Sequence, residues 1–384
     1  QGGQQVTKIR GASEPVEWSP PHRKSPRPFG HLLHGTHALE PELFRSGSNE
    51  TSYSTGRDDV ALQAPYCRRE WSTAGRGPDC NARALQMTQL PTKVTGQGET
   101  MISIIIPAHN AEKTLGSQVE ALLAQRCHVP WQIVVVDNNS GDATAEIAIS
   151  LDSAEIPVRV VKAADGLGPA YARNAGVAAT STPWIAFCDA DDVVAEGWLA
   201  SIAAALEDHE FVSGPLELDR LNPPWLVGSR GRRFSNARTS FEEIFPYASS
   251  CNMAITRALF EQVGGFDESL SVGEDIDLSL RIWQRGTDLH FKPGALVHYR
   301  LRDQLGELFR QSRQYGAAHP LILERLRSAG HDVSSRTHGA RRWVWLLRNL
   351  PLLRTHAGKA RWLWVAGGQI GRIQGGLRVR RLYI

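Results

Sequence analysis

The sequence has few cysteines and lacks the patterns in which cysteines hold zinc or form disulfide frameworks. The five cysteines are an odd number, lie far apart and form no C-x-x-C pair. Zinc sites and small disulfide-stabilised domains place their cysteines in close, even sets. The spacing therefore excludes both classes, and a reducing compartment such as the cytoplasm is the expected setting.

Long hydrophobic runs are also absent. No uninterrupted apolar stretch approaches the roughly 18 residues that cross a bilayer. The first residues, QGGQQVTKIRGASEP, contain no hydrophobic segment of the kind found in signal peptides. We therefore expect neither a transmembrane helix nor an export signal. With 41% hydrophobic residues among 384, the chain still has enough apolar material for a globular core.

The first hundred residues lack hydrophobic periodicity. Residues 1–100 are rich in Gly, Pro, Ser, Thr, Gln and Arg. Such a segment buries too little apolar surface to offset the entropy lost on ordering. The composition predicts a disordered extension over 1–100, a folded domain over 101–305 and a helical tail over 306–384.

From Met101 onward, short apolar runs alternate with helical patterns. Four runs rich in β-branched or aromatic residues predict buried strands at 102–106, 133–136, 158–161 and 184–187. Pro107 is expected to end the first of them. Strands that alternate with helices at this spacing form βαβ units, so we expect an α/β fold with a mostly parallel sheet and helices on both faces.

Three helices are predicted between these strands. The first has an apolar stripe at i, i+4, i+7 and i+8 made by Leu115, Val119, Leu122 and Leu123. The second is expected to begin at the cap Ser140 and to run to about Leu151, and the third to span 169–179.

Polar residues follow three of the strands directly. Asn110, Asp137 and Asp189 each lie just beyond a predicted strand end. Ligands of parallel α/β sheets bind at the carboxyl ends of the strands. The three side chains are therefore expected to line one crevice.

The stretch FCDADDVV places Asp189, Asp191 and Asp192 within four positions. One interpretation is that they open a helix starting near Ala195, because acidic residues in a first turn favour the helix dipole. The other is that they hold a divalent cation, since Mg²⁺ and Mn²⁺ prefer oxygen ligands and share them with substrate phosphates. Three carboxylates exceed what a cap requires, which favours the metal site.

Five blocks, taken in order, resemble the family 2 glycosyltransferases. They are ISIIIPAHN (102–110), VVVDNNSGDAT (134–144), GPAYARNAG (168–176), WIAFCDADD (184–192) and GGFDESLSVGEDIDLSLRIWQRG (264–286). The resemblance covers roughly half of the chain, from about Ile102 to Arg300. It implies a GT-A fold and inverting transfer of a sugar from a nucleotide diphosphate, and it identifies 101–305 as the catalytic domain.

The resemblance also implies roles for the donor side of the site. Pro107 and Ala108 would line the base pocket, and Asp137 would contact the nucleoside. Arg173 would contact the base or the phosphates.

Further roles concern the metal and the reaction. Asp189 would face the ribose or the metal, and Asp191 would bind the Mg²⁺ or Mn²⁺ that bridges the diphosphate. Asp275 would be the general base, with Glu274 beside it. Judged from these two residues alone, Glu274 and Asp275 fit an acidic helix start as well as they fit a catalytic role.

One position departs from the family pattern. Many uridine-nucleotide users carry a second Asp where this chain has Asn138, and an amide both donates and accepts hydrogen bonds whereas a carboxylate only accepts. The base therefore stays open between uracil, thymine and guanine, with Asn138 kept among the nucleotide-binding candidates.

The chemistry suits these residue types. A sugar hydroxyl is a weak nucleophile, so a carboxylate must take its proton during attack, and a divalent metal neutralises the departing diphosphate. One base and one displacement give inversion, whereas a second, nucleophilic carboxylate would give retention. His298, at the end of the run ALVHY, is either a further metal ligand or a hydrogen-bonded structural histidine, and the role of Asn252 stays open.

The last fifty residues lack negative charge. From Arg336 to Ile384 there are eleven Lys or Arg and no Asp or Glu, interleaved with Trp343, Trp345, Trp362 and Trp364. This pattern favours helices lying on an anionic membrane surface. The alternatives are a helical pair packed on the catalytic domain, or nucleic-acid binding, which no nucleic-acid fold signature accompanies.

The sequence thus predicts a metal-dependent inverting glycosyltransferase. Its partners would be a nucleotide-sugar donor, a carbohydrate or lipid-linked acceptor and the cytoplasmic face of the cell membrane, with no nucleic acid. Two alternatives remain. DADDV also matches the D-x-D-x-[TV] loop of haloacid-dehalogenase-type phosphatases, although that loop normally follows a first strand and here three strands precede it. A degenerate GT-A module that only binds nucleotide sugars is the other.

Overall fold

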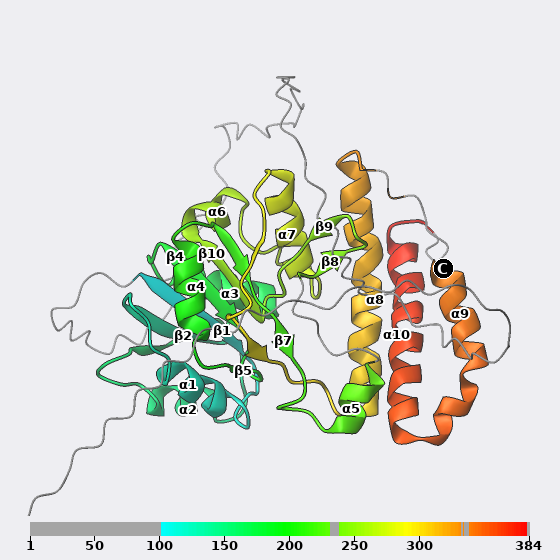
Figure 1. The fold of residues 1–384 in the computed structure, drawn as a ribbon, viewed down its shortest axis with the longest axis horizontal. Helices are drawn as coiled ribbons and strands as arrows, with labels where there is room; N and C mark the ends of the chain where they lie inside the picture. Colours follow the sequence, from blue (N-terminus) through cyan, green and yellow to red (C-terminus); the bar gives the residue numbers. More distant parts are fainter. Residues whose placement is uncertain (1–100, 231–237, 332, 334–337, 382–384) are drawn as a thin grey trace, which may run out of the picture. The chain divides into compact units, whose positions relative to one another are not determined.

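The computed structural model describes residues 101–230, 238–331, 333 and 338–381 (Figure 1). The extension predicted over 1–100 lies outside the described residues, and so do Cys67 and Cys80. The other three cysteines are free thiols.

The centre of the fold is a seven-stranded sheet with the order β11-β6-β10-β4-β1-β2-β3. Its strands are β1 (Ile102–Ala108), β2 (Trp131–Asp137), β3 (Val158–Lys162), β4 (Trp184–Cys188), β6 (Phe211–Ser213), β10 (Asn252–Thr256) and β11 (His290–Phe291). Every pairing in this sheet is parallel except the two that β10 makes with β4 and β6. The predicted mostly parallel sheet is confirmed.

Helices cover both faces of the sheet, as predicted. One face packs against α1 (Leu115–Leu123), α2 (Thr144–Ser150) and α4 (Trp198–Leu206). The other packs against α3 (Pro169–Ala178), α6 (Arg257–Gln262) and α7 (Glu274–Gln284). Because both faces are covered, the inner strands are apolar on both sides, which explains the continuous runs of Ile and Val in the sequence.

Two boundary predictions were wrong. Strand β1 continues through Pro107 to Ala108, pairing with β2 alone after its register with β4 ends at Ile105. With one side of the strand unpaired there, the missing N–H of proline is tolerated. Helix α2 begins at Thr144 and has no side-chain cap, because the hydroxyl of Ser140 instead accepts a hydrogen bond from the backbone N–H of Asn110.

Short elements follow β4 and β6 at the carboxyl edge of the sheet. A three-stranded sheet has the order β5-β12-β7, formed by β5 (Val193–Val194), β7 (Leu216–Glu217) and β12 (Val297–His298). Helix α5 (Pro224–Ser229) and the hairpin of β8 (Ser240–Phe241) and β9 (Phe245–Pro246) come from the stretch between β7 and β10.

The C-terminal part is helical, with α8 (Leu305–Ser328), α9 (His338–Arg348), the 3₁₀ helix η1 (Leu350–Arg354) and α10 (His356–Arg378). Helices α8 and α10 lie side by side (Figure 1). Their backbones approach so closely that a Cβ on Gly371 would lie 2.0 Å from the carbonyl oxygen of Arg313. Glycine at this position therefore permits the contact.

The C-terminal helices pack on the α/β part of the chain. Helix α8 shares a hydrophobic cluster with α7 and the β8–β9 hairpin through Ile322 and Leu326, and α10 shares another with α5 through Ala360. Within the described residues, no helix combines the length and hydrophobicity needed to cross a membrane. The predicted domain boundaries at 100 and 305 remain predictions.

Candidate active site

The carboxyl ends of three neighbouring strands bring the predicted polar residues to one edge of the sheet. Ala108 and Asp137 are opposite one another at the ends of β1 and β2. Asp189 directly follows β4, which pairs with β1 on its other side. Asn110, Asp137 and Asp189 therefore all follow strands that end at this edge, and the expectation that they line one crevice stays a prediction.

Hydrogen bonds join the loops after β1 and β2. The side-chain oxygen of Asn110 accepts a 2.8 Å bond from the backbone N–H of Gly141. One carboxylate oxygen of Asp137 accepts a 3.0 Å bond from the N–H of Ser140. The two loops therefore form one unit beside Pro107 and Ala108, the residues proposed to line the base pocket.

Asn138 is buried and its amide is used inside the protein. Its nitrogen donates to the carbonyls of Ala163 at 2.6 Å and Gly166 at 2.9 Å, and its oxygen accepts from the N–H of Gly168 at 2.9 Å. An aspartate could not donate the first two bonds. The departure from the family pattern is thus explained by the loop between β3 and α3, which Asn138 holds in place.

The three aspartates after β4 lie in the tight turn that leads into β5. Strand β5 follows Asp192 directly and α4 begins only at Trp198, so the interpretation of these residues as a helix start is wrong. Asp189 and Asp191 are partly exposed, whereas Asp192 is 1% exposed. Burial and the neighbouring charge of Asp189 raise the pKa of Asp191.

Arg173 joins two of the predicted site segments. Its guanidinium donates to Asp189 at 2.6 Å and to Glu274 at 2.9 Å, and it lies 5.6 Å from the ring centre of Phe266. Arg173 is 2% exposed. The structure therefore brings Arg173 to the site, but both terminal nitrogens of its guanidinium are already bonded to carboxylates.

The start of helix α7 presents Glu274 and Asp275. Gly273 precedes them as N-cap with a φ of 83°, a conformation that strains other residues. The carboxylate of Asp275 accepts bonds from the backbone N–H groups of Ile276 at 2.8 Å and Ser250 at 3.3 Å. Burial, followed by the charge of Glu274, raises the pKa of Asp275 to about 7. The pair thus opens helix α7, as one of the two interpretations expected, and the catalytic role of Asp275 stays a prediction.

One group of side chains in the described residues has the spacing of metal ligands. Ligand atoms of Asp189, Asp192 and Cys251 lie within 4.8 Å of one another, and one carboxylate oxygen of Asp192 is buried without a hydrogen-bond partner. Burial raises the pKa of the Cys251 thiol, and a neutral thiol is a poor ligand for a hard cation. The carboxylates fit Mg²⁺ or Mn²⁺ and the thiol does not.

His298 does not join that group. It lies in β12, where its Nδ1 is 2.6 Å from Glu217 and its Nε2 is 2.9 Å from the guanidinium of Arg220. Both ring nitrogens thus have partners, as expected for a hydrogen-bonded structural histidine. Asn252 is structural as well, because its amide bonds the indole N–H of Trp198 and two backbone carbonyls.

Two basic residues at the site were not singled out from the sequence. The guanidinium of Arg302 lies 3.1 Å from the carboxylate of Asp191. Arg300 donates its backbone N–H to Asp192 at 2.7 Å and its guanidinium to the carbonyl of Asp191 at 2.8 Å. Both follow His298 closely in VHYRLR, and that cluster of positive charge is the signal that could have identified them.

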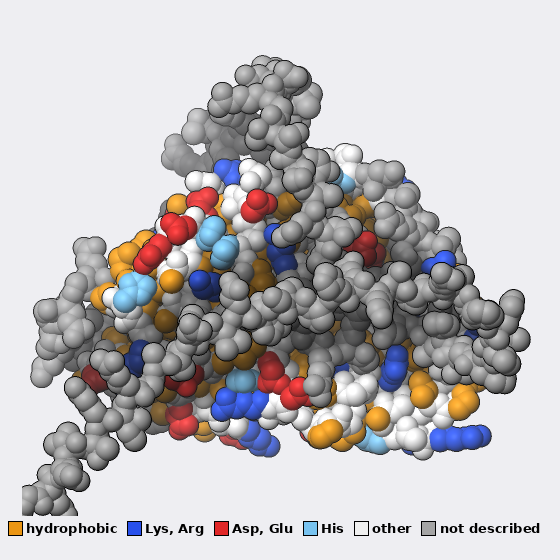
Figure 2. Space-filling view, viewed as in Figure 1, with side chains coloured by type: hydrophobic (Ala, Val, Ile, Leu, Met, Phe, Trp, Pro, Cys, Tyr) orange, Lys and Arg blue, Asp and Glu red, His pale blue; other side chains and the backbone are white. Residues whose placement is uncertain are grey.

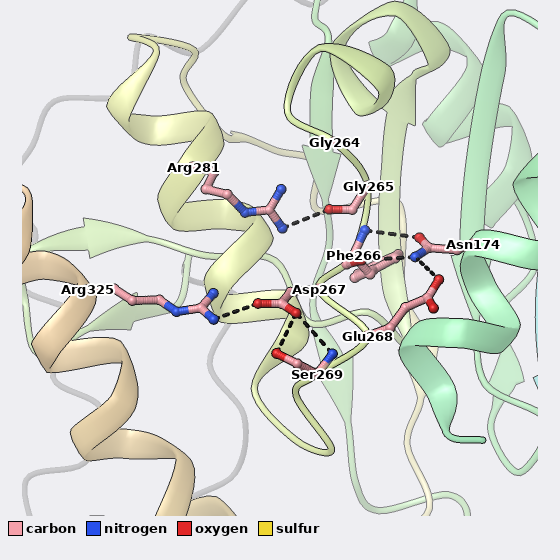
Figure 3. A pocket seen from close by; sticks show the side chains of 9 residues that line it. All are labelled: Asn174, Gly264, Gly265, Phe266, Asp267, Glu268, Ser269, Arg281 and Arg325. Atoms are coloured by element: carbon pink, nitrogen blue, oxygen red, sulfur yellow. Dashed lines mark hydrogen bonds and ion pairs between the residues drawn. The ribbon is translucent and has the colours of Figure 1, made fainter. Parts of the chain in front are cut away.

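An open pocket of about 580 Å³ is lined by none of these predicted residues, although Phe266, which contacts Arg173, is part of its wall (Figure 3). Its lining includes Arg281 and Arg325, which form ion pairs with Asp277, and Asp267, which pairs with Arg325. Because the charges are matched within the protein, the pocket lining anchors the loop that precedes α7 to helices α7 and α8.

Family comparisons agree with this arrangement. The model described as glycosyl transferase family 2 matches residues 103–264, and that described as glycosyl transferase family group 2 matches residues 184–370. This chain belongs to the family 2 glycosyltransferases. The matches place β1 to β4 and the aspartate loop within the family region, and they favour this family over the phosphatase alternative.

Curated relatives of this family 2 glycosyltransferase are moderately similar. The pre-mycofactocin glycosyltransferase of Mycobacterium tuberculosis strain H37Rv is 28% identical over 244 residues, 61% of this chain and 50% of that protein. The succinoglycan biosynthesis protein ExoO of Rhizobium meliloti is 28% identical over 218 residues, 53% of this chain and 61% of that protein. The chain spans about half to three fifths of the length of these relatives.

Among solved structures, the mannosyltransferase PcManGT from Pyrobaculum calidifontis in complex with GDP-Man and Mn²⁺ is similar, with a TM-score of 0.49 and 16% identity. The alignment covers 71% of this chain and 86% of that one.

Proposed function

We propose that this family 2 glycosyltransferase transfers a sugar from a nucleotide diphosphate sugar to an acceptor hydroxyl with inversion, and that Asp275 is the general base. The observation that carries the proposal is the difference between the two carboxylates at the start of α7. Glu274 is ion-paired with the buried Arg173, while Asp275 forms no ion pair among the described residues and has its pKa raised to about 7 by burial. A carboxylate with that pKa is ionised and basic near neutral pH.

The arrangement also supports inversion. Retention requires a second carboxylate that attacks the anomeric carbon. Glu274, the nearest candidate, is held by Arg173 at 2.9 Å and is 6% exposed. One available base suits a direct displacement. In that reaction the acceptor oxygen attacks the anomeric carbon while its proton passes to Asp275.

Asp189 and Asp191 would hold the divalent cation. Both are partly exposed carboxylates at the carboxyl edge of the sheet, and the raised pKa of Asp191 reflects a site that gains from a cation. When bound, Mg²⁺ or Mn²⁺ would neutralise the charge that develops on the departing nucleotide diphosphate. His298 would leave this set, because binding a metal would break one of its two hydrogen bonds.

The remaining predicted residues divide between contact and support. Pro107, Ala108 and Asp137 would contact the nucleoside from the ends of β1 and β2. Asn138 and Arg173 would act as positioning residues, because their polar atoms are bonded to the loop before α3 and to the carboxylates of Asp189 and Glu274.

The setting that we propose is assembly of a polysaccharide or glycolipid on a carbohydrate or lipid-linked acceptor. A relative named for succinoglycan biosynthesis supports this setting. The protein would work in the cytoplasm, peripherally on the inner face of the cell membrane, and without nucleic acid.

Exposed hydrophobic side chains support the membrane contact. Val344, Leu347 and Leu350 are 46%, 70% and 49% exposed on α9 and η1, and Figure 2 shows basic side chains beside hydrophobic ones in this region. The four tryptophans are half-buried instead. For example, the indole N–H of Trp362 donates to the carbonyl of Leu346 at 3.0 Å.

Vesicle sedimentation tests the membrane proposal. The protein should bind anionic vesicles at low salt and release them as salt rises, since charge is screened over about 8 Å at physiological ionic strength. Leu347→Glu should weaken binding, whereas Ile149→Glu, which changes a residue on α2 that is 52% exposed, should not. Equal binding by both variants, or none by the wild type, would contradict the proposal.

A thermal-shift screen of nucleotide sugars with Mn²⁺ tests the function itself. A ligand that binds only the native state raises its stability, so the donor should raise the melting temperature and the metal should increase that shift. The hydrolysis product of the bound donor should have inverted anomeric configuration. Binding without any turnover would indicate a degenerate module, and a trapped aspartyl-phosphate on Asp189 would indicate the phosphatase.

A further inference from the structure

A group of four side chains joins the C-terminal helices to the region of Asp275. We call Arg230, Tyr299, Tyr315 and Trp364 the Arg230 cluster. The guanidinium carbon of Arg230 lies 3.6 Å from the ring centre of Trp364. The ring of Tyr315 meets that of Trp364 edge-on, with centres 6.0 Å apart, and the hydroxyls of Tyr299 and Tyr315 are hydrogen-bonded. The cluster thus combines residues from the end of α5, the segment after β12, α8 and α10.

The cluster lies next to the candidate active site. Tyr299 immediately precedes Arg300, whose backbone N–H bonds Asp192. The phenol of Tyr315 is close enough to Asp275 for that carboxylate, after burial, to raise the pKa of Tyr315. Tyr315 is also 44% exposed, so one face of the cluster is open to solvent.

Arg230 differs from Arg173 and Arg302 in having no acidic partner among the described residues. Arg173 and Arg302 each form an ion pair with an aspartate. In contrast, the Nε and Nη1 atoms of Arg230 are buried with no hydrogen-bond partner in the described part of the chain. Burying a guanidinium with unpaired N–H groups is costly. The positive charge of Arg230 therefore suits a binding partner that supplies a negative charge, such as an anionic group of a substrate.

Packing fixes this guanidinium in place. Helix α5 packs against α10 through Arg230 on Trp364 and through Trp225, whose ring centre lies 4.3 Å from that of His356. The cation–π contact holds the plane of the guanidinium on the indole. Its buried Nε and Nη1 atoms stay unpaired in this position, and the planar edge of a guanidinium is the geometry with which arginine recognises phosphate and carboxylate.

We propose that the Arg230 cluster binds an anionic group, a phosphate or a carboxylate, of the acceptor substrate. The inference rests on the proposed function, because it places the acceptor on the side of Asp275 that the C-terminal helices cover. The acceptor would then carry its negative charge next to the sugar that receives the new residue. In this arrangement, α8 and α10 form part of the acceptor site as well as a membrane-facing surface.

Titration calorimetry with small probes tests the proposal on the full chain loaded with the nucleotide sugar found in the thermal-shift screen. The probes are glucose, glucose 6-phosphate and glucuronate, which present the same ring without charge, with a phosphate and with a carboxylate. A hydrogen bond to a charged group contributes enough for about a ten- to hundredfold preference. Wild type should therefore bind at least one charged probe more tightly than glucose by that factor, and the two charged probes distinguish the two chemistries.

Substitutions assign the preference to Arg230. Arg230→Gln should abolish it, Arg230→Lys should retain it in weakened form, and Arg354→Gln, which removes an exposed arginine from η1, should leave it unchanged. All three should bind the nucleotide sugar as wild type does, and absence of donor binding by wild type would instead contradict the proposed function. Equal binding of all three probes by wild type, or an unchanged preference in Arg230→Gln, would overturn the inference. The wild-type comparison stands even if a variant does not fold.

Discussion

The guanidinium of Arg173 lies 2.9 Å from the carboxylate of Glu274, and its other terminal nitrogen lies 2.6 Å from Asp189. One buried arginine therefore ties the start of α7 to the end of β4. Without Arg173, the carboxylates of Glu274 and Asp189 would lose their shared cationic partner. The ion pairs occupy the carboxylates of Glu274 and Asp189, whereas Asp275 forms no ion pair among the described residues and has its pKa raised to about 7 by burial.

Asp275→Asn should separate binding from chemistry. The amide keeps the size of the side chain but cannot accept the acceptor's proton, and a positioned general base contributes about 10²- to 10⁴-fold to rate. Turnover should fall by that order while nucleotide-sugar affinity, measured by calorimetry, stays near wild type. Glu274→Gln is the matched control and should lose less, since it keeps a neutral hydrogen bond to Arg173. A rate close to normal in Asp275→Asn would place the base elsewhere.

The pH dependence of the reaction should follow Asp275. Its pKa is raised to about 7, so the carboxylate is protonated and inactive below that pH and becomes basic above it. We expect kcat/KM to rise tenfold per pH unit below about pH 7 and to level off above it. The rising limb should disappear from the residual activity of Asp275→Asn.

The same raised pKa predicts that the stability of the fold falls as pH rises, whereas activity rises. A carboxyl group whose pKa is higher in the folded protein than its usual value of about 3.9 stabilises the fold at low pH and loses that contribution as pH rises through about 7. Asp275→Asn should therefore melt at a higher temperature than wild type, by a margin that is larger at pH 8 than at pH 5. A margin that does not change with pH would contradict the burial argument.

Asp191→Asn should weaken metal-dependent binding of the donor. A neutral amide is a poorer ligand than a carboxylate for a hard cation. In titrations with Mn²⁺ the variant should lose most of the metal-dependent gain in nucleotide affinity, and in metal-free buffer it should bind as wild type does. Full retention of the gain would mean that other carboxylates hold the cation.

Arg173→Met should destabilise the fold by about 3–5 kcal/mol, because removing one partner of a buried ion pair leaves charge uncompensated. Urea denaturation measures the free energy of unfolding. The control is Glu261→Gln, which breaks a 3.5 Å pair with Arg257 at a side chain that is 63% exposed. That pair should change stability by less than about 0.5 kcal/mol. Similar losses in both variants would refute the bridging role.

Asn138→Asp should destabilise the protein by about 1–3 kcal/mol, since the carboxylate would face the carbonyls of Ala163 and Gly166 without a proton to donate. Asn139→Asp is the control, because Asn139 is exposed and makes only a 3.4 Å contact with Gly166. If the first variant is as stable as the second, Asn138 is a nucleotide contact and not a support of the loop.

Much of the fold follows from local patterns. The Ile and Val runs, the apolar stripe of Leu115, Val119 and Leu122, and the alternation of strands and helices predict the sheet and its two helical layers, because burial on both faces imposes hydrophobicity directly on the chain. The same order places Asp137 and Asp189 at one edge, since parallel strands all end on the same side. The sequence alone thus determined the family, the sheet and the positions of the acidic residues.

Tertiary packing decided how those residues are paired. No local pattern specifies contacts between segments that lie far apart in the chain. Such contacts join Arg173 to Asp189 and Glu274, Arg302 to Asp191, and Arg230 to Trp364. Charge and burial act through distance in space, so one carboxylate becomes an ion-pair partner at Glu274 and its neighbour Asp275 has its pKa raised to about 7. For the same reason the basic, tryptophan-rich tail proved to be a packed helical layer beside the site, because burial of its rings depended on a surface that only the folded domain provides.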